Sequence, residues 1–244
     1  MNILTIGNSF SQDATKYLYG IARAANVDLK TTNLYIGGCP LSKHFKNAMS
    51  EEKKYNLIFN GMTTDFYVSI KEALISREWD YVSFQQGSVA SINYDTYQPY
   101  LNELSAYVKK YAPEAKQIIH QTWAYGQGSQ LLHEKMGYAD QKDMFNDVKN
   151  AYEKAAKAIN AEFIVPSGEV LQALINEGVE SVHRDGLHAS LGLGRYAMAL
   201  VWFIMITGKP VEDNSFRDFD APVSEEEVYL AKKCATAVAK KQEK

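Results

Sequence analysis

The chain has 244 residues, of which 46% are hydrophobic and 23% charged, and its formal net charge is −3 at pH 7. This length and composition allow one sizeable core, so we expect a single domain over residues 1–244. The charge is small and both signs are spread along the chain, which gives no reason to expect nucleic acid or a membrane surface as a partner. Cys39 and Cys234 lie far apart and in no metal-ligand spacing, so we expect two unpaired thiols.

The start of the chain carries no sign of a targeting segment. The first residues run directly into an apolar stretch, without the basic region and cleavage site of a signal peptide. The longest apolar stretch, residues 197–206, is too short to span a bilayer. We therefore expect a cytoplasmic protein from the sequence as it stands, and a secreted or periplasmic one if a leader has been removed.

In the first part of the chain, strand-like runs alternate with an amphipathic helix. Residues 3–6 predict a buried strand, and residues 12–25 predict a helix because their apolar side chains recur at helical spacing. Residues 29–36 predict a second strand, which Gly37 and Gly38 end.

A small hairpin is expected next. Residues 55–59 and 66–70 have strand character on either side of an Asn-Gly pair at residues 60–61. A Ser-x-x-Glu capping box then begins a short helix over residues 69–76, and residues 81–84 predict the third core strand.

The second half of the chain continues the alternation. Residues 122–138 contain three glycines and no clear period, and a loop of this length is typical of segments that line a site. The remaining predictions are strands over residues 117–120 and 162–165 and helices over residues 97–111, 141–159, 166–175, 191–206 and from residue 224 onward. Strands separated by helices favour a parallel sheet covered on both faces, with functional groups at the carboxyl ends of the strands.

Ser9 follows the first strand, where the chain turns into a helix. A serine there can attack a carbonyl carbon while its own N–H helps to hold the oxyanion. The alternative is that Ser9 or Ser11 only caps the helix.

Asp185 and His188 lie three residues apart in a polar loop before the last apolar helix. Gly186 permits a tight turn, so the carboxylate can accept the Nδ1 proton and leave Nε2 free to take the proton of a serine. Two alternatives remain open: a turn that caps the next helix, and a metal site that adds His183.

Polar or aromatic residues also follow the other strands. Gly38 can supply a second oxyanion donor through its N–H, and a glutamine amide after the third strand can supply a third. Alternation with the strand favours Gln86 over Gln85, without deciding between them. Trp123 and Tyr125 follow the fourth strand, where they either line a substrate pocket or belong to the core.

These segments together resemble the SGNH (GDSL-type) hydrolase superfamily. Residues 7–11 read GNSFS, similar to its first block with Asn in place of the usual aspartate, and Gly38 is similar to the second-block glycine. Residues 86–88 stand where the third block normally offers Gly-x-Asn-Asp, and Asp185 with His188 matches the fifth block. In detail the chain resembles the bacterial branch called domain of unknown function 4886 (DUF4886). The Gln-Gly pair is similar to the Gln-Gly-Glu of carbohydrate acetylesterases in the same superfamily.

The resemblance implies a three-layer α/β/α, flavodoxin-like fold with a five-stranded parallel sheet, and an ester hydrolase without metal or other cofactor. Ser9 would be the nucleophile, His188 the base and Asp185 its orienting partner. The Ser9 and Gly38 amides would form the oxyanion hole with Gln86.

The function we expect is a serine esterase that removes an acetyl or other short acyl group from a carbohydrate. Its partner would be a small-molecule or carbohydrate ester, and the sequence leaves the oligomeric state open. The alternatives are a non-catalytic glycan-binding module on the same scaffold and a metal-dependent phosphoesterase using His183, Asp185 and His188. Sensitivity to a chelator would separate the last from a serine enzyme.

Overall fold

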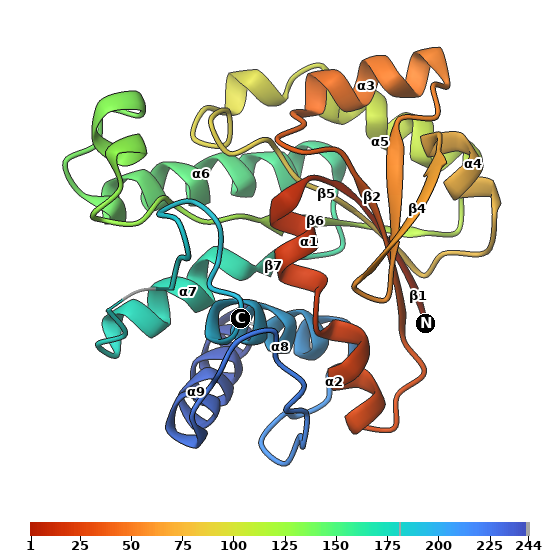
Figure 1. Ribbon diagram of the computed structural model, residues 1–244. Helices are drawn as coiled ribbons and strands as arrows, with labels where there is room; N and C mark the ends of the chain where they lie inside the picture. The colour runs from red at the N-terminus through yellow and green to blue at the C-terminus, as the bar shows by residue number, and fades with distance from the viewer. Residues whose placement is uncertain (181, 243–244) are drawn as a thin grey trace.

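The computed structural model describes residues 1–180 and 182–242 as a sheet with helices on both faces (Figure 1). The sheet has seven strands in the order β4-β3-β2-β1-β5-β6-β7. The strands are β1 (Asn2–Gly7), β2 (Lys30–Tyr35), β3 (Tyr55–Phe59), β4 (Met62–Val68), β5 (Tyr81–Phe84), β6 (Lys116–Gln121) and β7 (Ile164–Pro166). Strands β2, β1, β5, β6 and β7 run parallel, as expected from the alternation of strands and helices.

The predicted sheet of five strands is too small, because the β3–β4 hairpin joins it. Strand β3 pairs antiparallel with β2, and β4 pairs antiparallel with β3 as the edge strand. Asn60 and Gly61, with φ of 51° and 78°, make the two-residue turn between them. Because this turn is so short, pairing resumes at Met62, four residues before the predicted start of the second strand.

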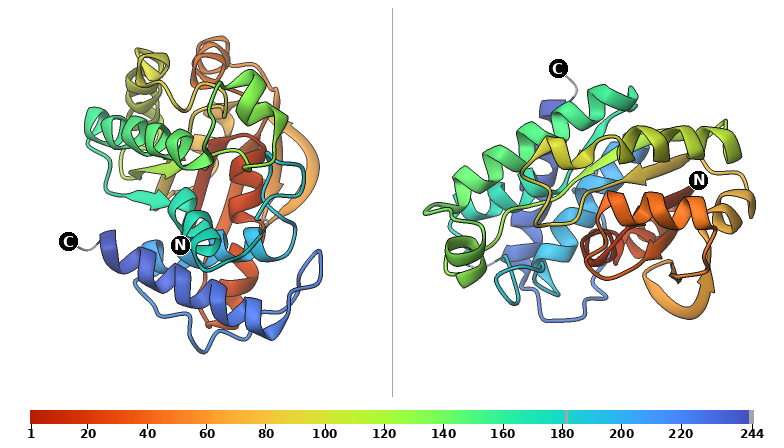
Figure 2. Two further views of the ribbon diagram at one scale, coloured as in Figure 1. Left: turned by 90° about the vertical axis from the view of Figure 1, so that its left-hand side faces the viewer. Right: turned by 90° about the horizontal axis from the view of Figure 1, so that it is seen from above.

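Two layers of helices cover the sheet, and the two further views show the same arrangement (Figure 2). The helices packed together on one side are α3 (Leu41–Ser50), α4 (Ile70–Ile75), α5 (Tyr100–Tyr111) and α6 (Gln141–Ile159). Those on the other side are α1 (Ser9–Thr15), α2 (Leu18–Ala24), α7 (Ser167–Asn176), α8 (Leu193–Thr207) and α9 (Glu225–Gln242). Short turns of helix also occur at η1 (Tyr94–Tyr97) and η2 (Leu131–Lys135). Within the described residues, no helix has the length and apolar character to cross a membrane.

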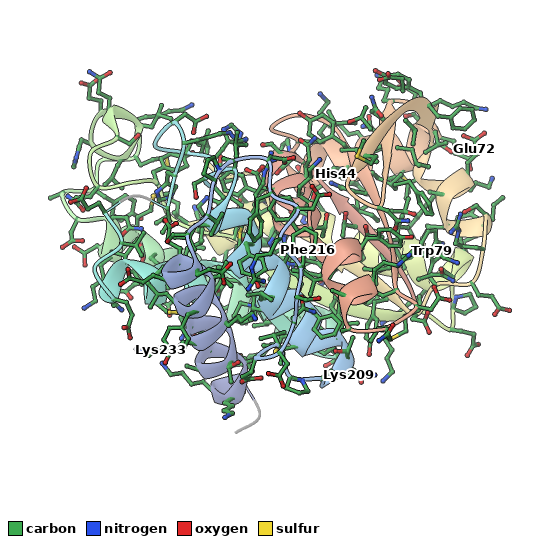
Figure 3. All side chains as sticks on the ribbon, turned by 60° about the horizontal axis from the view of Figure 1, so that its bottom comes forward. His44, Glu72, Trp79, Lys209, Phe216 and Lys233 are labelled. Atoms are coloured by element: carbon green, nitrogen blue, oxygen red, sulfur yellow. The ribbon has the colours of Figure 1, made fainter. Side chains whose placement is uncertain are left out.

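The segment between α8 and α9 closes the lower layer. Phe216 lies there against Tyr17, Tyr196 and Phe219, and Figure 3 marks its position near the N-terminal helices. A Cβ atom on Gly20 of α2 would come within 2.3 Å of the Phe216 ring, so only glycine permits this contact. The packing ties the C-terminal part of the chain to the helices that follow β1.

Two helical predictions differ from the structure. The helix predicted over residues 12–25 begins earlier, at Ser9, and is divided into α1 and α2 near Tyr17, whose hydroxyl donates to Leu191 O and accepts from Asp220 N. Helix α3 was not predicted from the sequence. Its inner face contains His44 and Asn47, which are buried and bond to the Tyr55 hydroxyl, so its hydrophobic pattern is incomplete. The two cysteines are buried and unpaired, as expected.

Candidate active site

Ser9 begins helix α1 at the carboxyl end of β1. The side chain of Asn8, not of either serine, caps the helix: its Oδ1 accepts a hydrogen bond from Phe10 N at 2.9 Å. Capping by Asn8 leaves the Ser9 hydroxyl available, and Ser9 Oγ lies 3.0 Å from Nε2 of His188. The Ser9 N–H belongs to the first helical turn, where backbone donors have no acceptor within the helix.

Asp185 holds the imidazole of His188 from the other side. Asp185 Oδ2 lies 2.8 Å from His188 Nδ1, while Oδ1 accepts the backbone N–H groups of Leu187 and His188 at 3.0 and 2.7 Å. Gly186 makes this tight turn possible with a φ of +74°. A carboxylate can only accept, so Nδ1 carries the hydrogen and the lone pair of Nε2 faces Ser9.

The charge of Asp185 is stable at neutral pH. Burial by itself would raise the pKa of this carboxyl group, but the hydrogen bonds from the His188 backbone and ring and from Leu187 N outweigh it. The net effect lowers the pKa to about 2. The carboxylate therefore stays negative next to the imidazole and can stabilise the imidazolium that forms when His188 takes a proton.

An ion-pair cluster fixes the loop of His188 to the helix of Ser9. Asp13, one turn after Ser9 on α1, is buried and bonds to Arg184 at 2.9 Å and to Arg195 at 2.8–2.9 Å. Arg184 directly precedes Asp185, and its backbone N–H donates to His188 O at 3.0 Å. Ser9 and His188 are thus tied to the same ion-pair cluster.

Gly38 lies in a turn that contacts Asn8, the residue before Ser9. Cys39 N donates to Ile36 O at 3.2 Å to close the turn, and Gly38 has a φ of +60°, which favours glycine. Asn8 Nδ2 donates to Cys39 O at 3.2 Å, which links this turn to the residue before the nucleophile. Gly38 is exposed and a Cβ atom there would meet open space, so a ligand can approach its backbone closely.

The prediction that Gln86 points its amide beside these groups is wrong. Gln86 Nε2 donates to both the carbonyl and the hydroxyl of Thr96, at 3.1 and 3.2 Å, which uses both amide hydrogens. Its Oε1 accepts from Leu41 N and Gly87 N. The side chain of Gln86 does lie on the same side of the sheet as Phe84, but this side faces α3, α5 and η1. Its role is to hold loops together.

Trp123 and Tyr125, the predicted pocket walls, are also placed differently. Each is about 1% exposed, so neither offers a ring face to a substrate. Trp123 stacks on Phe10 with ring centroids 4.0 Å apart and donates to Leu187 O at 2.9 Å. Trp123 therefore supports both the nucleophile helix and the loop of His188 from the core.

The metal alternative finds little support in the geometry. The ring of His183 donates from Nε2 to Ala124 O at 3.0 Å, and Asp185 and His188 are occupied with each other. Over residues 1–180 and 182–242, no three His, Cys, Asp or Glu side chains are grouped closely enough to hold a metal ion.

A cavity of about 730 Å³ lies next to the carboxylate of Asp185. Its walls come from residues 126–131, from residue 180 and from residues 182–186, and include Ser129, Gln130, Glu180 and Asp185. The long loop predicted over residues 122–138 thus borders the site, as its length suggested. Another cavity, of about 560 Å³, lies at the opposite edge of the sheet around Trp79, and its lining does not include Ser9, Asp185 or His188.

The sequence reasoning missed the layer of polar residues beneath Ser9. Asn8, Gln85 and His120 are all at most 2% exposed and bonded in series. Two adjacent glutamines at the end of an apolar strand were a usable signal, because buried amides must be satisfied.

Comparison with known proteins agrees with this architecture. A family model described as a domain of unknown function, DUF4886, matches residues 2–238. A solved DUF4886 family protein from Bacteroides uniformis ATCC 8492 is 31% identical and superposes with a TM-score of 0.90, covering 98% of this chain and 94% of that one.

More distant structures share the fold. A protein from Slackia heliotrinireducens assigned to the SGNH hydrolases is 23% identical with a TM-score of 0.58, covering 83% of this chain and 97% of that chain. An acetylxylan esterase from Geobacillus stearothermophilus is 15% identical with a TM-score of 0.52, covering 84% and 92% of the two chains. At these identities the likeness establishes the fold alone. No curated protein matches the sequence.

Proposed function

We propose that this chain, which belongs to the DUF4886 family and has the fold of the SGNH hydrolases, is a serine ester hydrolase. The observation that carries the proposal is the series of contacts from Ser9 Oγ to His188 Nε2, at 3.0 Å, and from His188 Nδ1 to Asp185 Oδ2, at 2.8 Å. A serine hydroxyl is a weak nucleophile at neutral pH, and this arrangement supplies the base and the orienting carboxylate that it needs.

In the first half of the reaction, His188 Nε2 takes the proton of Ser9 while Oγ attacks the carbonyl carbon of the ester. The negative oxygen of the tetrahedral intermediate is held by the N–H groups of Ser9 and Gly38. His188 then gives its proton to the leaving alcohol as the C–O bond breaks. The products of this half are the free alcohol and an acyl ester on Ser9.

In the second half, water enters the position of the alcohol. His188 accepts its proton as the water oxygen attacks the acyl carbon, and the same two backbone donors hold the second intermediate. Return of the proton to Ser9 Oγ releases the carboxylic acid. Asp185 stays ionised throughout and stabilises the imidazolium in each half.

The substrate class that we propose is a short acyl ester, such as an acetyl group, on a carbohydrate. The cavity bordered by Asp185, whose lining includes neither Ser9 nor His188, carries hydroxyl, amide and carboxylate side chains at Ser129, Gln130 and Glu180, which would suit a polar alcohol extending past the reacting ester. The acetylxylan esterase from Geobacillus stearothermophilus, which shares the fold, is described as acting on such an ester. The core position of Trp123 and Tyr125 removes the aromatic walls from this argument.

Replacement of the nucleophile tests the proposal. Ser9→Ala should lower the turnover of p-nitrophenyl acetate by about 10³-fold or more while the protein stays folded. Ser50→Ala, the same chemical change at the end of α3, should keep wild-type turnover. Release of acetate from acetylated xylooligosaccharides, measured with the same variants, tests the carbohydrate part separately. Wild-type turnover in Ser9→Ala contradicts the assignment.

A further inference from the structure

A chain of buried polar side chains runs from α8 to the nucleophile turn, and the reaction described above does not use it. Its members come from five different elements or turns and are each at most 2% exposed: Trp202, Ser167, His120, Gln85 and Asn8. Four hydrogen bonds of 2.7 to 3.1 Å connect them in that order. Such a series in the core is costly unless every member is satisfied.

The direction of the hydrogen bonds is fixed from the nucleophile end. Phe10 N is a backbone donor, so the atom of Asn8 that it contacts must be the oxygen. The atom of Gln85 that contacts this same oxygen, at 2.7 Å, must then be the amide nitrogen. Gln85 Oε1 consequently faces His120 Nδ1 at 2.9 Å, and Nδ1 carries a hydrogen.

The other end gives the same direction. The indole N–H of Trp202 can only donate, and it contacts Ser167 Oγ at 3.1 Å. The Ser167 hydroxyl then donates to His120 Nε2 at 3.0 Å, which suits an imidazole whose hydrogen is on Nδ1. Burial lowers the pKa of His120 to about 3, so the ring is neutral at ordinary pH. Every bond therefore donates toward the nucleophile turn.

Asn8 is where this series meets the reaction centre. Its oxygen caps the helix that begins with Ser9, and its nitrogen donates to Cys39 O, the carbonyl that follows Gly38. One side chain thus spans the two backbone segments whose N–H groups hold the oxyanion in the proposed reaction. The backbone of Gly7 packs closely against Gln85 and Ser11, since a Cβ atom on Gly7 would lie 3.0 Å from Gln85 Oε1 and 2.3 Å from Ser11 Oγ.

We propose that Gln85 and His120 are positioning residues, which lock Asn8 in the orientation that clamps the Ser9 turn to the Gly38 turn and so preorganise the oxyanion hole. Donors of this kind act only when they are held close to the place where charge develops. The proposal rests on the proposed esterase function, because an oxyanion hole matters only if Ser9 attacks an acyl carbon.

The first test compares two buried glutamines. Gln85→Met removes the amide and keeps the length of the side chain, and it should lower kcat for p-nitrophenyl acetate about 10- to 100-fold with KM within about twofold. This loss is smaller than that for deleting an oxyanion donor, about 10²–10³, because the backbone donors remain but are misplaced. The matched control is Gln117→Met, a buried glutamine at the start of β6 that bonds to Ser105 and should keep wild-type kcat.

The second test uses rescue at His120. His120→Leu should lower kcat as Gln85→Met does, whereas His120→Asn can still donate to Gln85 Oε1 and should recover kcat to within about threefold of wild type. Wild-type kcat in Gln85→Met and His120→Leu, with only a lower melting temperature, overturns the positioning role. Failure of a fluorophosphonate to label Ser9 in the wild-type protein instead overturns the proposed function.

A third measurement needs no variant and decides the matter if the substitutions prevent folding. The long-range ¹⁵N–¹H spectrum of the wild-type protein should show His120 as the neutral tautomer with hydrogen on Nδ1 at pH 7. The Nε2–H tautomer overturns the proposal, because Nδ1 would then be an acceptor and Gln85 would have to present the opposite end to Asn8.

Discussion

Asp185 does two things with its two carboxylate oxygens. One oxygen accepts the Nδ1 hydrogen of His188, and the other accepts two backbone N–H groups of the same turn. The two backbone hydrogen bonds fix the direction of the carboxylate. The bond to Nδ1 can therefore set the tautomer and the angle of the imidazole. The side chain remains about half exposed, which means that its geometry, more than its burial, orients the base.

Replacing this carboxylate by an amide should therefore impair the reaction without unfolding the protein. In Asp185→Asn the amide nitrogen donates to Nδ1, which places the imidazole hydrogen on Nε2, where it faces Ser9. We expect turnover of p-nitrophenyl acetate to fall by about 10³- to 10⁴-fold, the size of effect that a wrong tautomer causes. Asp28→Asn, at a well-exposed carboxylate, serves as the control. Turnover within tenfold of wild type in Asp185→Asn would exclude the role given to this residue.

Among single residues, the sequence best predicted those that have distinctive chemistry and lie next to the end of a core element. Ser9, Gly38, Asp185 and His188 were predicted as site residues because each stands beside a core element, and the structure places their segments at one edge of the sheet. Gln86 was misplaced because alternation indicates a side of the strand but not which loop packs on that side. The core position of Trp123 depends on its stacking on Phe10, which lies more than one hundred positions away.

Helix α1 connects the chemistry to the fold through Asp13. This carboxylate is about 1% exposed and receives the guanidinium groups of Arg184 and Arg195, from the loop of His188 and from α8. An uncompensated buried charge is expensive, so each of these groups depends on the others. The helix therefore carries both the nucleophile and the residue that fixes the base relative to it.

Removal of Asp13 should lower both stability and activity. For Asp13→Ala we expect the free energy of unfolding to fall by about 3 kcal/mol, the lower part of the range for breaking a buried ion pair, because Arg184 is partly exposed to water. Urea denaturation measures this change, and Asp28→Ala, at an exposed carboxylate, should change stability by no more than about 0.5 kcal/mol. Equal stability of the two variants would mean that the cluster does not support the loop.

Elements with a clean hydrophobic pattern were predicted well. Strands β1, β2, β5 and β6 match their predicted ranges to within one residue, and the capping boxes at Ser69 and Ser224 are formed. Helix α3 was missed although Leu41, Phe45 and Ala48 recur at helical spacing; buried His44 and Asn47 take the place of apolar residues on its inner face. The place of the hairpin in the sheet also depends on tertiary pairing, which a local pattern does not contain.

For the whole molecule, two fully buried histidines link stability to pH. Burial lowers the pKa of His44 and of His120 to about 3, and Lys43 adds to the effect at His44. In the unfolded chain both rings bind protons below about pH 6.5. The unfolded state therefore binds more protons than the folded state between about pH 6.5 and 3, and stability is lost as the pH falls through this window.

We predict that the free energy of unfolding decreases by about 2 kcal/mol for each of these histidines between pH 7 and pH 5. Urea denaturation at the two pH values measures the decrease. A variant in which one ring is replaced, His120→Asn, should lose about half of it, whereas His133→Ala, at an exposed ring, should keep it. Equal stability of the wild-type protein at pH 7 and pH 5 would show that these rings are accessible to protons.

The central claim is that Ser9 is an activated nucleophile, and the intact mass of the protein after treatment with a fluorophosphonate tests it without any assumption about the substrate. The wild-type protein should gain the mass of one phosphonyl group, which peptide mapping should place on Ser9, and Ser50→Ala should react equally. Ser9→Ala should gain no mass, and Asp185→Asn should react far more slowly. An unmodified wild-type protein, or an adduct on another residue that persists in Ser9→Ala, would contradict the account.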